Sequence, residues 1–225
     1  MTSANRRTYA TDPVSWIPRV LRKVYSLWVS ATFPFVECGS GLSIHYSVDL
    51  RRPHASHIKL GDDVQIAKDA WLNVVRDDDS HTEPAIVIED GCVIARRAQI
   101  SARNSIHIER DVILAANVII MDHNHAYEDV TRPIRDQGVT NGGTIRIEAG
   151  SWIGQGAAIL CDRGDLVIGR NSVIAANAVV TRSCSPYSVV SGNPARVVKQ
   201  FDPARQEWVL GSNRPAADKR EPLAS

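Results

Sequence analysis

Two histidines stand close together in the stretch Met121-Asp122-His123-Asn124-His125. An imidazole that is held in place can act as a general base near neutral pH. Asp122 would either hold one tautomer of His123 or cap the turn, and His125 would orient a substrate. A metal site is the weaker interpretation, because no third ligand follows at a metal-binding spacing. The alternative without chemistry is a pair of surface histidines on a loop.

A six-residue repeat flanks this stretch on both sides. An amphipathic helix does not place residues i and i+6 on one face, and a simple strand alternates with a period of two, so neither explains the pattern. The aliphatic anchors of the repeat are Leu60, Ile66, Leu72, Ile88, Ile94, Ile100, Ile108, Leu114, Ile120, Ile147, Ile153, Ile159, Ile168, Ile174 and Val180, with Ile44 and Leu50 as a partial earlier set.

Short strands joined by tight corners do produce a six-residue period, with each anchor pointing inward. Three hexads make one triangular coil of about eighteen residues, and such coils stack on one another. The sequence therefore predicts an all-β fold, a parallel β-solenoid. Ile108 and Ile147 lie 39 residues apart, about twice the length of one coil, so we expect an inserted loop at 121–144 that carries both histidines.

The segments outside the repeat are expected to cover its ends. Residues 1–39 are predicted to form a polar tail and an amphipathic capping helix at Val14–Trp28. Residues 40–200 form the repeat domain. Residues 201–225 are predicted to form a short helix at Asp202–Trp208 and a polar, disordered tail.

The predicted N-terminal helix has apolar residues at helical spacing, with Arg19, Arg22 and Lys23 on its other face. One interpretation is that it packs on the repeat domain or on a neighbouring subunit. The other is that it lies on a membrane surface as a basic amphipathic helix, which would give the protein a peripheral membrane contact. No stretch reaches the ~20 apolar residues that a spanning helix requires.

The composition limits the choice of partners and compartment. The chain has 225 residues and a formal net charge of +1, so no strong field favours nucleic acid as a partner. Four cysteines without close spacing (Cys38, Cys92, Cys161 and Cys184) favour neither a disulfide framework nor a zinc site. We expect reduced thiols in a cytoplasmic protein, peripheral at the inner face of the membrane if the helix binds there.

Three segments, taken with the repeat, carry a resemblance to a known family. They are Asp122-His123-Asn124-His125, Ser151-Trp152-Ile153-Gly154 and Ser191-Gly192-Asn193-Pro194-Ala195-Arg196. The sequence resembles the left-handed β-helix, hexapeptide-repeat acyltransferases over roughly residues 40–200. Within this family it is similar to the sugar and polysaccharide O-acetyltransferases of the galactoside, maltose and nodulation type. The left hand comes from the resemblance, since the general preference for right-handed crossovers points the other way.

The resemblance implies acetyl transfer from acetyl-CoA to a sugar hydroxyl of a glycan or its precursor, with no metal required. His123, three residues after Ile120, matches the family's catalytic base, which takes the hydroxyl proton during direct attack on the thioester. The catalytic set is then His123, His125 and Asp122, with Asn124 near the acceptor. Asp122 and Asn124 stand where those enzymes have Gly and Pro.

The family binds acetyl-CoA in the groove between adjacent solenoids, which implies a homotrimer with sites between subunits. Trp152 matches a residue that lines this groove, and the backbone amide near Gln155 matches the oxyanion donor. The longer segment Cys161–Asp165 replaces a two-residue turn of the family and reshapes the groove. The matched positions are, for the CoA arm and nucleotide, Ala176, Thr181 and Arg182; for the phosphates, Arg196 and Lys199; and for the acceptor, Gln99.

Two other functions remain open at this point. The acceptor is an amine, such as an amino sugar or serine, or the solenoid is a scaffold without enzymatic activity. The extension at 73–85, with its Asp77–His81 run, is either a solvated loop or part of an acceptor site.

Overall fold

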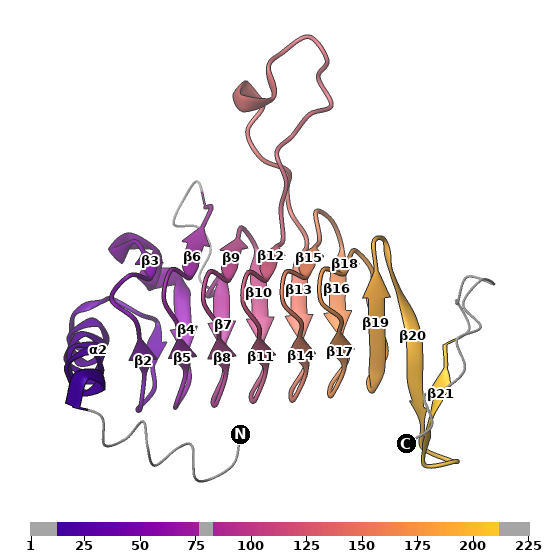
Figure 1. The fold of residues 1–225 in the computed structure, drawn as a ribbon. Helices are drawn as coiled ribbons and strands as arrows, with labels where there is room; N and C mark the ends of the chain where they lie inside the picture. Colours follow the sequence, from indigo (N-terminus) through magenta and orange to yellow (C-terminus); the bar gives the residue numbers. More distant parts are fainter. Residues whose placement is uncertain (1–12, 77–82, 212–225) are drawn as a thin grey trace.

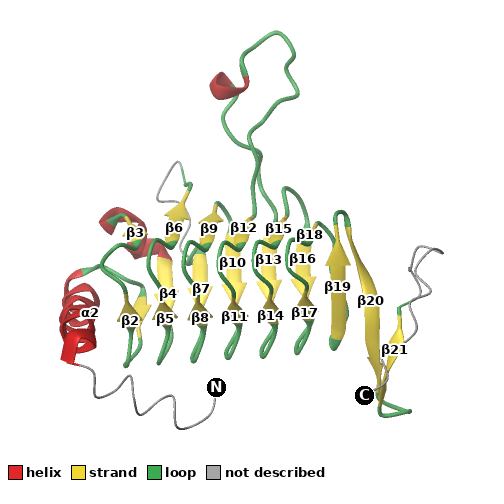
Figure 2. Cartoon of the chain, viewed as in Figure 1, coloured by secondary structure: helices red, strands yellow, loops and turns green. Residues whose placement is uncertain are grey.

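The structure is a computed structural model that describes residues 13–76 and 83–211. Its body is a stack of triangular coils, and the three sides of each coil belong to three β-sheets (Figures 1 and 2). Sheet A contains β1 (Glu37–Cys38), β4 (Ile58–Leu60), β7 (Ile86–Ile88), β10 (Ser105–Ile108), β13 (Thr144–Ile147) and β16 (Asp165–Ile168). Sheet B begins with β2 (Ser43–Ile44), β5 (Gln65–Ile66), β8 (Val93–Ile94), β11 (Ile113–Leu114), β14 (Trp152–Ile153) and β17 (Val173–Ile174). Sheet C contains β3 (Asp49–Leu50), β6 (Trp71–Val74), β9 (Gln99–Ala102), β12 (Ile119–Met121), β15 (Ala158–Leu160) and β18 (Val179–Val180).

The predicted anchors form the core, which confirms the parallel β-solenoid. Every anchor from Leu60 to Val180 is at most 2% exposed. Anchors of neighbouring coils pair in register, as Ile88 and Ile147 do on either side of Ile108. Burying each such side chain contributes about 1.5–3 kcal/mol, so the stack of like residues is the main source of stability.

The corner between sheets B and C turns through a residue with left-handed backbone. Gly, Asn and Asp adopt this conformation at low cost, which explains why they occupy four of the five positions given below, with Arg97 as the exception. The residues concerned, with φ between 57° and 69°, are Asp69, Arg97, Asn117, Gly156 and Asn177.

A long arm leaves the solenoid after β12 and returns to β13 (Figure 1). It contains the 3-10 turn η2 (Ile134–Asp136) and a short antiparallel bridge between His125 and Val139. Because Ile108 and Ile147 still pair in register, the arm is inserted without breaking the stack of coils. This is the insertion expected from the interrupted repeat.

Helix α2 (Pro13–Thr32) lies over the open edge of the first coil (Figure 1). It is longer than the predicted Val14–Trp28 segment and contains Pro18 in its interior. Buried Ser26 joins it to strand β2: the serine hydroxyl accepts the Ile44 N–H at 2.9 Å and lies 3.2 Å from the Ile44 carbonyl oxygen. The helix therefore caps the edge of sheet B with a side chain.

The predicted C-terminal helix over Asp202–Trp208 is wrong. Strand β19 (Ser188–Gly192) adds to sheet B parallel to β17, and β20 (Ala195–Asp202) and β21 (Glu207–Leu210) follow as antiparallel strands. Backbone pairing to β19, which a local helical pattern does not reveal, explains the extended conformation.

Three predictions fall on residues outside the described part of the chain. They concern the tails at 1–12 and 214–225 and the Asp77–His81 run of the 73–85 extension. A 3-10 helix, η1 (Arg52–His57), precedes β4 within the described residues.

Candidate active site

His123 is held at the base of the arm by the residue before it. Its Nδ1 lies 2.9 Å from Oδ1 of Asp122, whose side chain is completely buried, while the His123 side chain is 10% exposed. A carboxylate on Nδ1 favours the tautomer with the proton on Nδ1, which leaves Nε2 with a free lone pair. His123 thus has the arrangement that a general base requires.

The Asp122 carboxylate is fixed by backbone donors from the preceding coil. Oδ1 accepts the Arg103 N–H at 2.7 Å, and Oδ2 accepts the N–H groups of Asn104 and Ser105 at 2.8 and 2.9 Å. Of the two roles considered for Asp122, orienting the imidazole and fixing the turn, the structure shows contacts for both. Together with the bond to His123, these three hydrogen bonds account for the burial of a charged group.

Arg76 supports the same backbone from its other side, a contact that the sequence did not indicate. Its guanidinium donates to the carbonyl oxygens of Arg103 and Asn104 at 3.1 and 2.8 Å, and to that of Glu83 at 2.7 Å. Arg76 therefore holds the turn whose N–H groups bind Asp122. No spacing rule links positions 76 and 122, because the two residues meet only through the stacking of coils.

His125 and Asn124 lie farther out on the arm, and both are exposed. The backbone of Asn124 is tied to Thr140 in both directions, and its side chain lies 3.5 Å from Oδ2 of Asp162. The 161–165 segment thus touches the base of the arm. His125 pairs through its backbone with Val139, so its side chain is carried by the arm and not by the solenoid.

Five of the residues matched to the CoA groove lie together, on sheet B and its corner with sheet C. Trp152 faces outward, with 50% of its surface exposed. It starts a row of paired residues across neighbouring strands of sheet B, in which Val173 and Val189 come next and Lys199 is last. The other three are Gln155 and Ala176, exposed at the same corner of successive coils, and Arg196 at the start of β20.

This surface has features that suit a polyanionic thioester. Among the described residues, no ion pair engages Arg196 or Lys199, and no hydrogen bond engages the backbone N–H of Gln155. Gly154, before Gln155, brings the coils together so closely that a Cβ there would lie 2.7 Å from the Ala176 nitrogen. Cations, a flat aromatic ring and an unused N–H are groups that bind phosphates, a nucleotide arm and an oxyanion.

The remaining matched residues lie elsewhere in the same chain. Thr181 and Arg182 are exposed and follow β18. They lie at the edge of sheet C where its strands end, and His123 follows β12 at the same edge. One side of the triangle, roughly 15–20 Å long, therefore separates His123 from Gln155 within one chain. The residues around Gln155 thus lie together at one corner of the triangle, and those around His123 lie together at the next. Within one chain the two groups do not meet.

Gln99 lies on the outer face of sheet C, in register with Trp71 and Ile119. It lines a shallow hollow of about 410 Å³ that also contains charged residues of the B–C corner, Asp69 and Arg97. The hollow combines these polar groups with the apolar side chains of Trp71 and Ile119, and it lies on the same sheet as β12, which leads into His123.

The cysteines do not offer a nucleophile at neutral pH. Burial raises the pKa of the Cys92 thiol to about 11, and burial also raises the pKa of Cys38, Cys161 and Cys184. All four are free thiols. Within the residues that the structure describes, no group of three or more His, Cys, Asp or Glu side chains is arranged to hold a metal ion.

Comparison with known proteins finds acetyltransferases. A Mycobacterium tuberculosis protein named as a probable acetyltransferase is 33% identical over 161 residues, which are 72% of this chain and 48% of that protein. An Escherichia coli protein provisionally named as a lipopolysaccharide biosynthesis O-acetyl transferase, WbbJ, is 26% identical over 136 residues, 58% of this chain and 68% of the other. The chain thus spans about half the length of the mycobacterial relative. No protein-family model matches the chain.

Solved structures share the fold. The N-acyltransferase AntD of Bacillus cereus, bound to dTDP and coenzyme A, matches with a TM-score of 0.60 at 18% identity, over 76% of this chain and 87% of that one. A hexapeptide-repeat acetyltransferase of Vibrio cholerae, bound to acetyl-CoA, matches with a TM-score of 0.53 at 18% identity, over 85% and 91%. A galactoside acetyltransferase bound to coenzyme A matches with a TM-score of 0.50 at 20% identity, over 83% and 74%. The fold of this chain is the left-handed, hexapeptide-repeat parallel β-helix.

Proposed function

We propose that this chain, which has acetyltransferase relatives and the hexapeptide-repeat left-handed β-helix fold, transfers an acetyl group from acetyl-CoA to a sugar hydroxyl. The observation that carries the proposal is the pair formed by His123 and buried Asp122, which leaves Nε2 of the imidazole free on a rigid support. The named role of the E. coli relative in lipopolysaccharide biosynthesis supports a glycan, or its precursor, as the acceptor.

In this proposal acetyl-CoA supplies the thioester carbonyl, and the chain moves one proton. Nε2 of His123 takes the proton of the acceptor hydroxyl as the oxygen attacks the carbonyl carbon. The backbone N–H at Gln155 stabilises the negative charge on the carbonyl oxygen. When the carbon–sulfur bond breaks, His123 returns the proton to the leaving sulfur. The raised pKa values of the four thiols support direct transfer over a cysteine-linked intermediate.

The proposal requires an oligomer, and we propose a homotrimer. His123 and Gln155 lie at opposite ends of sheet C in one chain, so a base and an oxyanion donor meet only if two chains contribute. The arm between β12 and β13 supports this, because it exposes large apolar side chains: Tyr127 is 58%, Val130 95% and Ile134 55% exposed. A neighbouring solenoid would cover them.

The test is release of free CoA thiol by the purified chain with acetyl-CoA and a panel of acceptors. We expect transfer to glycans or their saccharide precursors, and a loss of roughly 10²-fold or more in His123→Ala. His107→Ala is the matched control, because His107 lies on the outer face of sheet A beside Glu89. Equal rates in His123→Ala and the wild type would refute the general-base role.

The same panel separates the two other functions. Amino sugars and serine test an amine acceptor, for which transfer to nitrogen without transfer to any hydroxyl is the decisive result. A chain that neither binds acetyl-CoA in calorimetry nor releases thiol with any acceptor would be a scaffold.

A further inference from the structure

The apolar stripe of helix α2 faces away from the protein. Seven large apolar side chains lie along this stripe, and each is between 39% and 61% exposed, apart from Trp16 at 65%. Ser26 and Val29, by contrast, are 3% and 1% exposed and contact the first coil. At about 100° per residue, Val29 lies on the side of the helix opposite the centre of the stripe. The stripe consists of Trp16, Ile17, Val20, Leu21, Val24, Leu27 and Trp28.

This orientation is the reverse of the usual one for a helix on a globular protein, which buries its apolar face. Here the side that carries Ser26 and Val29 packs on the coil. Within the described residues, the apolar stripe remains exposed, and only Trp28 at its end has ring contacts, with Tyr25 and Phe33. The helix lies at the end of the solenoid and contacts the first coil through β2, and the other described elements lie on that one side of it (Figures 1 and 2). The exposed stripe therefore points to a partner outside this chain.

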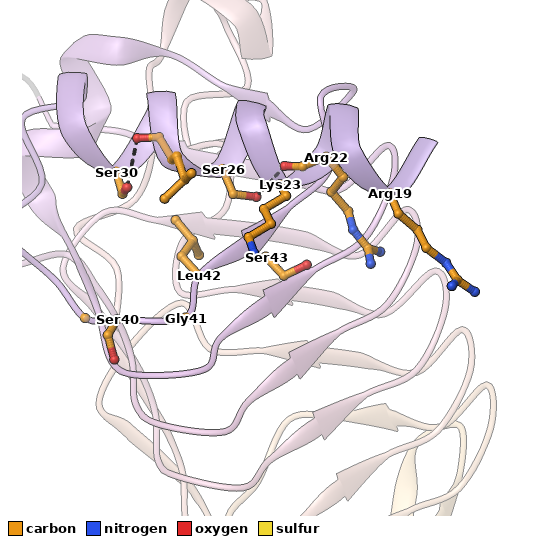
Figure 3. Close-up of a pocket in the computed structure, with 11 residues that line it drawn as sticks. Arg19, Arg22, Lys23, Ser26, Ser30, Ser40, Gly41, Leu42 and Ser43 are labelled. Carbon is orange, nitrogen blue, oxygen red and sulfur yellow. Dashed lines mark hydrogen bonds between the residues drawn. The ribbon is translucent and has the colours of Figure 1, made fainter. Parts of the chain in front are cut away.

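The charges beside the stripe identify the kind of partner. The helix contains Arg19, Arg22 and Lys23 and no acidic residue. These cations line a groove of about 660 Å³ between the helix and Gly39–Ser43, and in Figure 3 they extend from the helix on the side of that groove. Leu27 belongs both to the groove and to the stripe, so the basic and apolar surfaces are continuous.

Two carboxylates lie close to the far rim of this groove, that of Asp63 beside Gly41 and that of Asp62 beside Ser40. Asp62 accepts the backbone N–H and the hydroxyl of Ser40 at 2.6 and 3.0 Å. Asp62 is engaged by Ser40, and none of the residues that line the groove is acidic. The groove therefore suits an anionic group.

We propose that helix α2 binds the surface of a bilayer that contains anionic phospholipids. The stripe would lie in the boundary between head groups and acyl chains, with Trp16 and Trp28 near its two ends, and the cations would contact lipid phosphates. A second copy is a poorer occupant, since a symmetric contact through this face would bring the cations of two helices together. Among the residues that the structure describes, no helix has the length and hydropathy of a membrane span.

The test is co-sedimentation of the full chain with vesicles, and it does not depend on acetyl transfer. One set of vesicles is phosphatidylcholine alone, and the other contains phosphatidylglycerol as well. We expect the wild type to bind the anionic vesicles more strongly, and to lose that preference at high salt.

Leu21→Glu with Val24→Glu places two charges at the centre of the stripe, and we expect at least about a tenfold loss of binding. Leu210→Glu is the matched control, because Leu210 is 63% exposed on β21 at the opposite end of the solenoid, and it should bind as the wild type does. A second variant, Arg22→Gln with Lys23→Gln, keeps the stripe and should lower binding to anionic vesicles only.

Three results would overturn the proposal: no wild-type binding to either vesicle, equal binding of the wild type to both, or unchanged binding of the Leu21/Val24 variant. Light scattering of the same variant guards against misassignment. If the variant dissociates into smaller species and the wild type does not bind vesicles, the stripe is a contact between copies of the chain.

Discussion

The substitution Asp122→Asn tests how the solenoid holds the base. It keeps the shape of the side chain but replaces one carboxylate oxygen with an NH₂ group. Each oxygen accepts two hydrogen bonds, Oδ1 from Arg103 N–H and His123 Nδ1, and Oδ2 from the N–H groups of Asn104 and Ser105. Whichever oxygen the NH₂ group replaces, it then faces two hydrogen-bond donors and can accept from neither.

The magnitude follows from these contacts. Two hydrogen bonds to a charged acceptor are lost, at about 1.5–3 kcal/mol each, so the free energy of unfolding should fall by about 3–6 kcal/mol. If the amide nitrogen takes the place of Oδ1, the proton of His123 moves to Nε2 and the base is blocked. If it takes the place of Oδ2, the turn at 104–105 loses its anchor and the imidazole loses its position. We expect kcat to fall by roughly 10²- to 10⁴-fold in either case.

The assay combines urea unfolding with thiol release, measured well below the unfolding midpoint so that loss of folded protein does not imitate loss of catalysis. Asp162→Asn is the matched control, because its carboxylate lies beside the same loop but is 30% exposed. A variant Asp122→Asn with kcat within about threefold of the wild type, while His123→Ala is inactive, would refute the claim that Asp122 sets the tautomer and position of the imidazole.

Three further predictions concern the scaffold, the corner and the thiols. Leu114→Ala empties a fully buried position and should lower the free energy of unfolding by about 2–5 kcal/mol. Ile113 is half-exposed on the same strand, and Ile113→Ala should change the free energy of unfolding by less than about 0.5 kcal/mol. Similar urea midpoints for the two variants would contradict the assignment of inner and outer faces. Gly154→Ala sets a Cβ 2.7 Å from the Ala176 nitrogen and should destabilise the chain by about 1–3 kcal/mol and raise the KM for acetyl-CoA, so an unchanged Tm and KM would show that the corner is not tightly packed. Because burial raises the pKa of Cys92 to about 11, its thiol is protonated at pH 7, and iodoacetamide should leave transfer intact; inactivation would implicate a thiolate.

The repeat was readable from the sequence because burial in a β-helix is decided within each hexad. Leu60 and Ile88 point inward for the same local reason, and each coil adds another copy of the evidence. The C-terminal hairpin was not readable in this way. Phe201 pairs with Trp208, and their rings meet edge-on at 5.6 Å, but this pairing depends on β20 first adding to β19. The 202–208 segment contains helix-forming residues, but pairing with a neighbouring strand overrides that local preference.

For a related reason, the sequence indicated only some of the contacts that the structure shows around His123. The position of His123 after the last anchor of its coil is a local feature, whereas Arg76 and the backbone turn at 103–105 reach Asp122 through the stacking of coils. Helix α2 shows a different limit. Its periodic pattern predicted an amphipathic helix, but the pattern does not tell which face meets the protein, and here Ser26 and Val29 do.

The hydroxyl of Ser26 has a consequence for solubility. A β-helix that ended on strand β2 would present an open ladder to the end of another molecule and could grow into filaments. Ser26 occupies the N–H of Ile44 and lies beside its carbonyl oxygen, so that rung of the ladder is closed. At the opposite end, β20 and β21 run antiparallel and cannot extend a parallel stack. The length of the solenoid is thus set by two mismatched ends.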